Sequence, residues 1–281
     1  MIGLETREHN GLRIARLHYT ADPQKRTLEW KAQAQEGLSA RQWQREMEVD
    51  WSIAAGLGVY SEEFVRDWHV PSEPILANPD LPILRGWDWG LTPACVWCQV
   101  DHAGRVAVLA EVVVWNGRGD AKQRSVERFA PEIVLRSNEW FAGATFRDYA
   151  DPAGWSKQSS DAKTDVQTVN VMGIYPEKGP VTFAERRRAM NDRLTQSILG
   201  KPALTISPDC TMLIEGFQGK YGYDRIGETG RYHPTVEKNA WSHPMNALEY
   251  VVGALFVPRG TGEEMAEKPP KVGTPNRVTG Y

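Results

Sequence analysis

The chain is poor in cysteine and has no long apolar run, and both shortages exclude classes of protein. Its 281 residues include three cysteines, too few for a closed disulfide framework. Cys95 and Cys98 form a CysXaaXaaCys pair without a second pair or a histidine partner, so we expect buried thiols rather than zinc or redox chemistry. No apolar stretch is long enough to cross a bilayer, and the first residues lack the apolar core of a signal peptide. We therefore expect a soluble, intracellular protein without a membrane partner.

A phosphate-binding loop of the form GlyXaaXaaXaaXaaGlyLys followed by Ser or Thr is also absent. The chain alone is therefore not expected to hydrolyse ATP through such a loop. The formal net charge of −3 argues against coating nucleic acid by bulk charge. It leaves room for proteins that collect carboxylates around a metal and contact phosphates through a local basic surface.

Proline and glycine divide the chain. The range 71–82 contains four prolines, which disfavour both helix and sheet pairing. We read it as a linker with a boundary near 76–82, so that residues 1–78 form a linker or subdomain and 79–258 the main domain. The tail, 259–281, is rich in polar residues, proline and glycine, and is expected to be disordered.

Within the main domain, hydrophobic patterning predicts an α/β fold with a mixed sheet flanked by helices. Three strands over 83–89, 94–100 and 105–115 form an antiparallel meander. A fourth strand over 144–149 follows a helix at 120–141, which Pro131 should kink or restart. Later elements are expected at 183–199 (a basic helix), 203–206 (a strand) and 244–256 (a helix).

Two carboxylates stand where predicted strands end. Asp88 closes the first strand in TrpAspTrpGly, and Asp151 follows the fourth in AspProAlaGly. Each alone has an ordinary interpretation as a turn residue. In this strand order, however, the two strands are parallel neighbours, so both carboxylates should emerge side by side. Asp148 is expected to point to the opposite face from Tyr149 and to lie outside the site.

Three motifs in order make a more specific pattern. TrpAspTrpGly, AspProAlaGly and the segment LysAsnAlaTrpSerHisProMetAsnAlaLeuGluTyr at 238–250 resemble the carboxy-terminal nuclease domain of phage large terminases. Upstream motifs at 18–23, 43–50 and 58–60 resemble the segment that joins this nuclease to its packaging ATPase. The resemblance implies a ribonuclease H-like fold, and an endonuclease that cuts concatemeric double-stranded viral DNA during genome packaging. Without the phosphate loop, we expect either an excised domain or the product of a split gene.

The family places metal-binding acids at the ends of the first and fourth strands and in the last helix. The first two correspond to Asp88 and Asp151, whereas the third position holds Asn246 in place of the expected aspartate. Asparagine can offer a carbonyl oxygen to a metal but brings no negative charge and cannot act as a base. The site is therefore weakened, or another acid substitutes, or the asparagine was introduced to inactivate it.

The resemblance also implies Mg²⁺ or Mn²⁺, as two ions roughly 3.5 to 4 Å apart. Implied partners are double-stranded DNA, the packaging ATPase domain, the small terminase subunit and the portal, and the implied location is the cytoplasm of the infected bacterial host. Auxiliary candidates for the site, each with an ordinary structural alternative, are Glu111, Lys238 and His243. The candidates for contacts with DNA phosphates are Arg186, Arg187, Arg188, Lys220, Arg225 and Arg231.

Two alternatives to an active terminase nuclease stay open. A non-catalytic module of the same fold would bind DNA or dock to the portal or motor, and Asn246 is the chief argument for it. A resolvase or transposase core has a related fold but does not explain the terminase-like segment before residue 70.

Overall fold

A computed structural model describes residues 3–9, 12–35, 43, 47–48, 58–89, 92–114, 125–156, 163–226 and 231–257. The tail expected to be disordered, 259–281, lies outside these residues. Before the main domain, β2 spans Leu12–Leu17 and α1 spans Leu28–Gln35.

The described residues form a six-stranded mixed sheet in the order β10-β5-β4-β3-β6-β7. Strands β3, β4 and β5 are antiparallel neighbours, β6 runs parallel to β3, and β10 runs parallel to β5. The predicted fold class is thereby confirmed. The strands span Ile83–Asp88 (β3), Ala94–Val100 (β4), Val106–Val113 (β5), Phe146–Ala150 (β6), Glu177–Lys178 (β7) and Leu204–Ile206 (β10).

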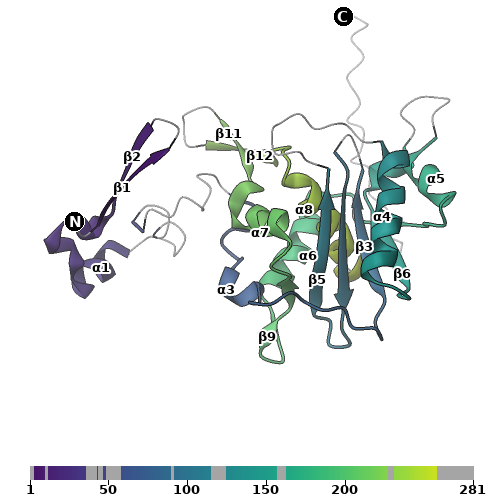
Figure 1. Ribbon diagram of the computed structural model, residues 1–281, viewed down its shortest axis with the longest axis horizontal. Helices are drawn as coiled ribbons and strands as arrows, with labels where there is room; N and C mark the ends of the chain where they lie inside the picture. The colour runs from purple at the N-terminus through teal and green to yellow at the C-terminus, as the bar shows by residue number, and fades with distance from the viewer. Residues whose placement is uncertain are drawn as a thin grey trace, which may run out of the picture.

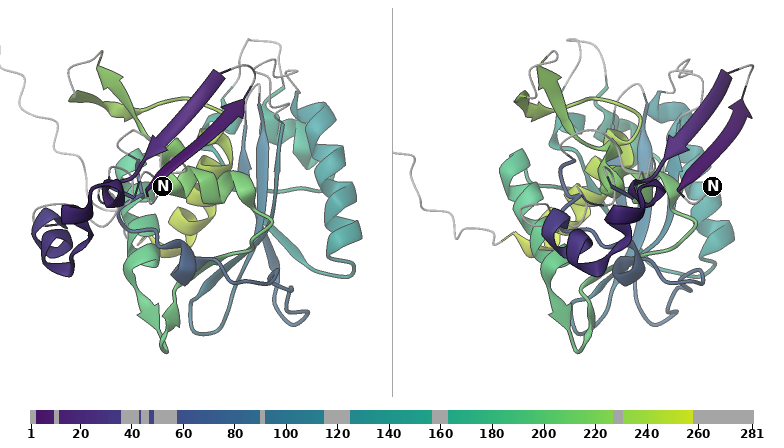
Figure 2. Two further views of the ribbon diagram at one scale, coloured as in Figure 1. Left: turned by 60° about the vertical axis from the view of Figure 1, so that its left-hand side comes forward. Right: turned by 90° about the vertical axis from the view of Figure 1, so that its left-hand side faces the viewer.

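Helices cover both faces of this sheet (Figure 1). One face carries α6 (Phe183–Thr195), α7 (Thr211–Glu215) and α8 (Ser242–Phe256), and the other α4 (Val126–Trp140) and α5 (Asp165–Asn170). The left view of Figure 2 shows α4 on the opposite side of the sheet from the first group. Pro131 does not restart its helix, because α4 runs through it as one helix. Burial of the neighbouring Phe129, Ala130 and Ile133 against the sheet holds that turn in place.

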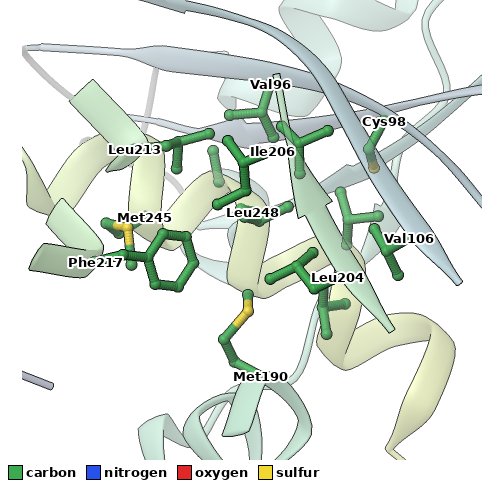
Figure 3. Close-up of a cluster of buried hydrophobic side chains, with 14 of the residues drawn as sticks. Val96, Cys98, Val106, Met190, Leu204, Ile206, Leu213, Phe217, Met245 and Leu248 are labelled. Carbon is green, nitrogen blue, oxygen red and sulfur yellow. The ribbon is translucent and has the colours of Figure 1, made fainter. Parts of the chain in front are cut away.

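Each face of the sheet has its own hydrophobic core, as strand alternation requires. Val96 and Leu204 pack with Met190 of α6, Leu213 of α7 and Leu248 of α8 on one face (Figure 3). On the other face, residues such as Trp87 and Trp97 pack against α4. The two cysteines of the CysXaaXaaCys pair are free and buried in different cores, which confirms the expectation of core thiols.

Residues 58–70 pack into the main core although they precede the predicted boundary. Tyr60 is fully buried and Phe64 is 8% exposed, both in the cluster beneath α8. The short helix α3 (Arg66–His69) follows. Farther along, the backbone of Ile75 donates to Ser207 Oγ at 3.2 Å, so the proline-rich segment lies against the sheet. The boundary near 76–82 stays a prediction, but the packed core begins before it.

The remaining elements are short. In Figure 1 the β1–β2 hairpin and α1 form a group apart from the sheet layers. A hairpin is formed by β11 (Tyr223–Ile226) and β12 (Arg231–Val236). The other bounds are Leu4–His9 (β1), Tyr19–Ala21 (η1), Pro23–Arg26 (η2), Pro152–Trp155 (η3), Ser197–Ile198 (β8), Lys201–Pro202 (β9) and Gly216–Lys220 (η4).

Candidate functional site

The close packing of α8 on β3 brings its side chains to the end of the strand. Alternation places Leu84, Gly86 and Asp88 on the face that α8 covers. A Cβ at Gly86 would lie 2.1 Å from the carbonyl oxygen of Ala247. Only glycine therefore allows the helix backbone to approach so closely.

Asp88 is held by the first turn of α8. Its side chain is 6% exposed, and its Oδ2 lies 2.8 Å from His243 Nδ1. On the other side of the ring, His243 Nε2 lies 2.6 Å from the hydroxyl oxygen of Thr92. With the Thr92 hydroxyl donating to Nε2, the proton on Nδ1 faces Asp88. A histidine that sequence reasoning treated as auxiliary thus contacts the first candidate acid directly.

Asp151 emerges from the neighbouring parallel strand. Its backbone N–H donates to the carbonyl of Trp87 at 3.1 Å, which fixes it beside the end of β3. One carboxylate oxygen accepts the N–H of Ala153 at 2.9 Å, and burial together with the nearby charge of Asp151 raises the pKa of Tyr250 in α8. The last helix therefore contacts Asp88 through His243 and brings Tyr250 near Asp151.

The charges of the two acids act on each other. Burial raises the pKa of Asp88 to about 6, the bond from His243 opposes this rise, and the nearby charge of Asp151 adds to it. A buried carboxylate beside a second one is costly unless a cation or a proton neutralises it. The two carboxylates at the adjacent ends of β3 and β6 therefore act on each other electrostatically, and their role as a site stays a prediction.

Asn246, the third candidate, lies on α8 within a buried polar network. Its Oδ1 is 3.2 Å from the hydroxyl oxygen of Tyr221. Burial and the nearby charge of Glu249, one helical turn farther on, raise the pKa of Tyr221. The Glu249 carboxylate is fully buried, accepts the Tyr60 hydroxyl at 2.8 Å and pairs with Arg186 at 3.1 Å.

Sequence reasoning missed this network, because Glu249 is a single acid in an otherwise apolar stretch. The apolar residues around it were the available signal, because an acid within an apolar helix is rarely buried unless it has partners. Nor does Glu249 complete a group of acids, since its carboxylate is enclosed by Arg186 and the two tyrosines. No three Asp, Glu, His or Cys side chains in the described part of the chain are grouped so that they could hold a metal.

Glu111 lies two strands away from Asp88. Its carboxylate accepts the backbone N–H groups of Met212 at 2.7 Å and Leu213 at 2.9 Å, at the start of α7. This is a helix-capping arrangement, and burial raises the pKa of Glu111 to about 7. This carboxylate therefore stabilises the start of α7, and an auxiliary role in the site stays a prediction.

The basic candidates are dispersed. Arg186 pairs with Glu249, and Lys220 pairs with Glu215 at 2.8 Å and lies over the ring of Trp241. The side chains of Arg187, Arg188 and Lys238 are exposed. Arg225 and Arg231 lie in β11 and β12, with side chains outside the described part of the structure.

Asp148 lies outside the site, as expected from alternation. It forms a buried ion pair with Arg85 at 2.7 Å and accepts the indole N–H of Trp87, on the face of α4. The ion pair with Arg85 therefore stabilises the face of the sheet that is opposite to Asp88.

Comparisons with known proteins agree on the fold. No family model matches the chain, and no curated protein matches it. Among solved structures, the large terminase of a thermophilic bacteriophage in complex with ADP aligns with a TM-score of 0.56 and 18% identity, over 85% of this chain and 55% of that one. Another crystal structure of the same terminase gives a TM-score of 0.54 at 18% identity, over 82% and 52% of the two chains.

The nuclease domain alone provides a third comparison. The P22 large terminase nuclease domain aligns with a TM-score of 0.50 and 10% identity, over 70% of this chain and 92% of that domain. The chain thus spans about half the length of the thermophilic phage terminase that it resembles. No helix among the described residues is long and apolar enough to cross a membrane. The chain has the ribonuclease H-like fold of the phage large terminase and of its nuclease domain.

Proposed function

We propose that the chain is a metal-dependent endonuclease that cuts double-stranded DNA during viral genome packaging. The observation that carries the proposal is the pair formed by Asp88 and Asp151 at the adjacent ends of two parallel strands. The likeness of the whole fold to a terminase nuclease domain supports it. Partners in this role would be a packaging ATPase, a small terminase subunit and a portal, in the cytoplasm of an infected bacterium.

The donor atoms suit a hard divalent cation. Two carboxylates and the neutral amide of Asn246 offer the oxygen ligands that Mg²⁺ and Mn²⁺ prefer. Burial raises the pKa of Asp88, and a bound cation would favour its charged form. When bound, the cation would supply Lewis acidity for the attack of water on a phosphodiester. The two-ion arrangement stays a prediction from the resemblance.

The residues of this chain have separable tasks in that reaction. His243 orients the carboxylate of Asp88, and the backbone N–H of Ala153 orients that of Asp151, so both are fixed before substrate arrives. Such positioning of ligands is what phosphoryl displacement requires of a protein. Arg187, Arg188 and Lys238 remain candidates for DNA phosphates, because their side chains are exposed. Arg186 is not included, since Glu249 holds its guanidinium.

Plasmid cleavage tests this proposal. Supercoiled plasmid would be incubated with the chain and MnCl₂ or MgCl₂, and compared with Asp88→Asn and Asp151→Asn. Asp148→Asn is the matched control, because this aspartate lies on the same strand pair but on the opposite face. We expect nicking or linearisation by the wild-type chain and not by the two site variants. Equal cleavage by Asp88→Asn would refute the assignment.

A second candidate function is a non-catalytic module that binds DNA or docks to the motor or portal. The presence of Asn246 where an acid is expected favours it, because the site then has one negative charge fewer. Cleavage only by Asn246→Asp would support this candidate, since it would reveal a disabled nuclease. Absence of cleavage by every variant, with DNA binding retained, would support it as well.

A further inference from the structure

The strand next to the candidate acids ends in a lysine that is not among the basic candidates of the sequence analysis. Lys178 closes β7, and the register pairs it with Ala150, the last residue of β6. The following residue, Gly179, donates its N–H to the Ala150 carbonyl at 2.9 Å. Because β3, β6 and β7 are parallel, Asp88, Asp151 and Lys178 all lie at carboxyl ends of strands. Open α/β sheets bind their ligands at these ends.

An aromatic ring holds the ammonium group of this lysine. Nζ of Lys178 lies 5.2 Å from the centroid of the Trp155 ring, and a cation over an indole face is attracted to it. Trp155 ends η3, the turn that begins directly after Asp151. The lysine side chain is exposed, and an ammonium has three donors, so the ring contact leaves donors for another acceptor.

The register also shows on which side of the acids the lysine lies. Ala150 belongs to the hydrophobic core under α4, and paired residues of neighbouring strands share a face. Lys178 therefore projects on the side of η3, whereas Asp88 projects toward α8, where it meets His243. The lysine flanks the candidate cation site and does not enter it.

A positive charge is needed at this end of the sheet if DNA is to bind there. The two carboxylates of the candidate site repel phosphates, and with a formal net charge of −3 the attraction of DNA has to be local. Two of the basic candidates, Arg186 and Lys220, are paired with acids. The ring of Trp155 is neutral, so it holds Lys178 without cancelling its charge.

We propose that Lys178, held by Trp155, binds a backbone phosphate of DNA that neighbours the phosphate to be cut. The inference rests on the proposed function, because it takes the ligand to be DNA. Contacts with phosphates fix the position of a duplex without reading its sequence. Lys178 would therefore hold the strand across the two acids and would contribute equally to the binding of every sequence.

Fluorescence anisotropy of a labelled DNA duplex tests the contact, with the full chain in EDTA so that no cleavage occurs. Salt would be varied from about 50 to about 200 mM, because the slope of log K against log salt reports the number of phosphates contacted. We expect Lys178→Ala to reduce the magnitude of this slope by about one and to weaken binding about five- to tenfold at the lower salt.

Lys201→Ala is the matched control. Lys201 is also an exposed lysine in a two-residue strand, β9. It directly precedes β10, which runs parallel to β5 and β3, so it lies at the amino ends of these strands. Its replacement should leave affinity and slope unchanged. An equal effect of Lys178→Ala and Lys201→Ala would overturn the proposal, and so would a wild-type chain that binds no duplex at the lower salt.

A second variant separates the ring from the charge. Trp155→Leu keeps an apolar side chain but removes the ring face, so affinity should fall about two- to fivefold with the salt slope unchanged. Unchanged affinity would overturn the role of Trp155 in holding the lysine.

Binding of Mn²⁺, followed by electron paramagnetic resonance, distinguishes a phosphate contact from a structural role. Lys178→Ala should leave Mn²⁺ affinity unchanged. Weaker Mn²⁺ binding with an unchanged salt slope would mean that Lys178 only supports the turn after Asp151, and would overturn the proposal. Plasmid cleavage is read separately. Lys178-dependent binding without cleavage by the wild type would refute the nuclease and leave this contact, whereas cleavage with binding indifferent to Lys178 would do the reverse.

Discussion

Replacing Gly86 with alanine should push α8 away from the sheet. The new Cβ would lie 2.1 Å from the carbonyl oxygen of Ala247 and 2.7 Å from the Cγ2 of Val251. Overpacking of a core costs about 1 to 3 kcal/mol. Because the closest atom belongs to the backbone and cannot rotate away, we expect a loss of about 3 kcal/mol in the free energy of unfolding.

Urea denaturation measures this loss, and Gly143→Ala is the matched control. Gly143 has a positive φ of 78°, but nothing lies within 4 Å of its added Cβ. Its substitution should cost about 1 kcal/mol from backbone strain alone. The shifted helix of Gly86→Ala should also weaken Mn²⁺ binding, since α8 carries His243 and Asn246. A loss no larger than that of Gly143→Ala would refute the close contact.

Three further predictions concern neighbouring groups. Asp148→Asn leaves the buried Arg85 without a counter-charge and should cost about 3 to 5 kcal/mol in urea denaturation, with Mn²⁺ affinity unchanged; a loss below about 1 kcal/mol would contradict this. For Glu111, burial raises the pKa from 4.5 to about 7, so the folded state holds its proton more tightly than the unfolded state does. Wild-type stability should therefore fall by up to about 3 kcal/mol as pH rises through that window, a decline that urea titrations should not find in Glu111→Gln. Thr92→Val removes the hydroxyl that fixes His243 and should weaken Mn²⁺ binding severalfold in a titration followed by electron paramagnetic resonance. Unchanged affinity would show that Thr92 does not contribute to the site.

Much of the sheet could be predicted from the amino-acid sequence, because its strands are short apolar runs separated by turn residues. The pairing of Asp88 with Asp151 followed from one topological step, the parallel placement of β3 and β6. By contrast, β1 (Leu4–His9) was not predicted, since LeuGluThrArgGluHis has too few apolar residues to show a buried face.

Other parts of the site depend on contacts that no local pattern contains. Glu249 meets Tyr60 across 189 positions of the chain and Arg186 across 63. Arg186 was grouped with its exposed neighbours because a run of arginines suggests a solvated or DNA-binding helix face. In the structure Arg186 is partly buried, whereas Arg187 and Arg188 are exposed. Only the packing of α6 against α8 determines which arginine turns inward.

Binding of Mn²⁺ to the metal-free chain tests the central claim most directly. A titration followed by electron paramagnetic resonance would compare the wild type with Asp88→Asn, Asp151→Asn and the control Asp148→Asn. We predict saturable binding by the wild type and the control, and its loss in both site variants. Binding that survives in Asp88→Asn and Asp151→Asn would show that these carboxylates do not form the cation site.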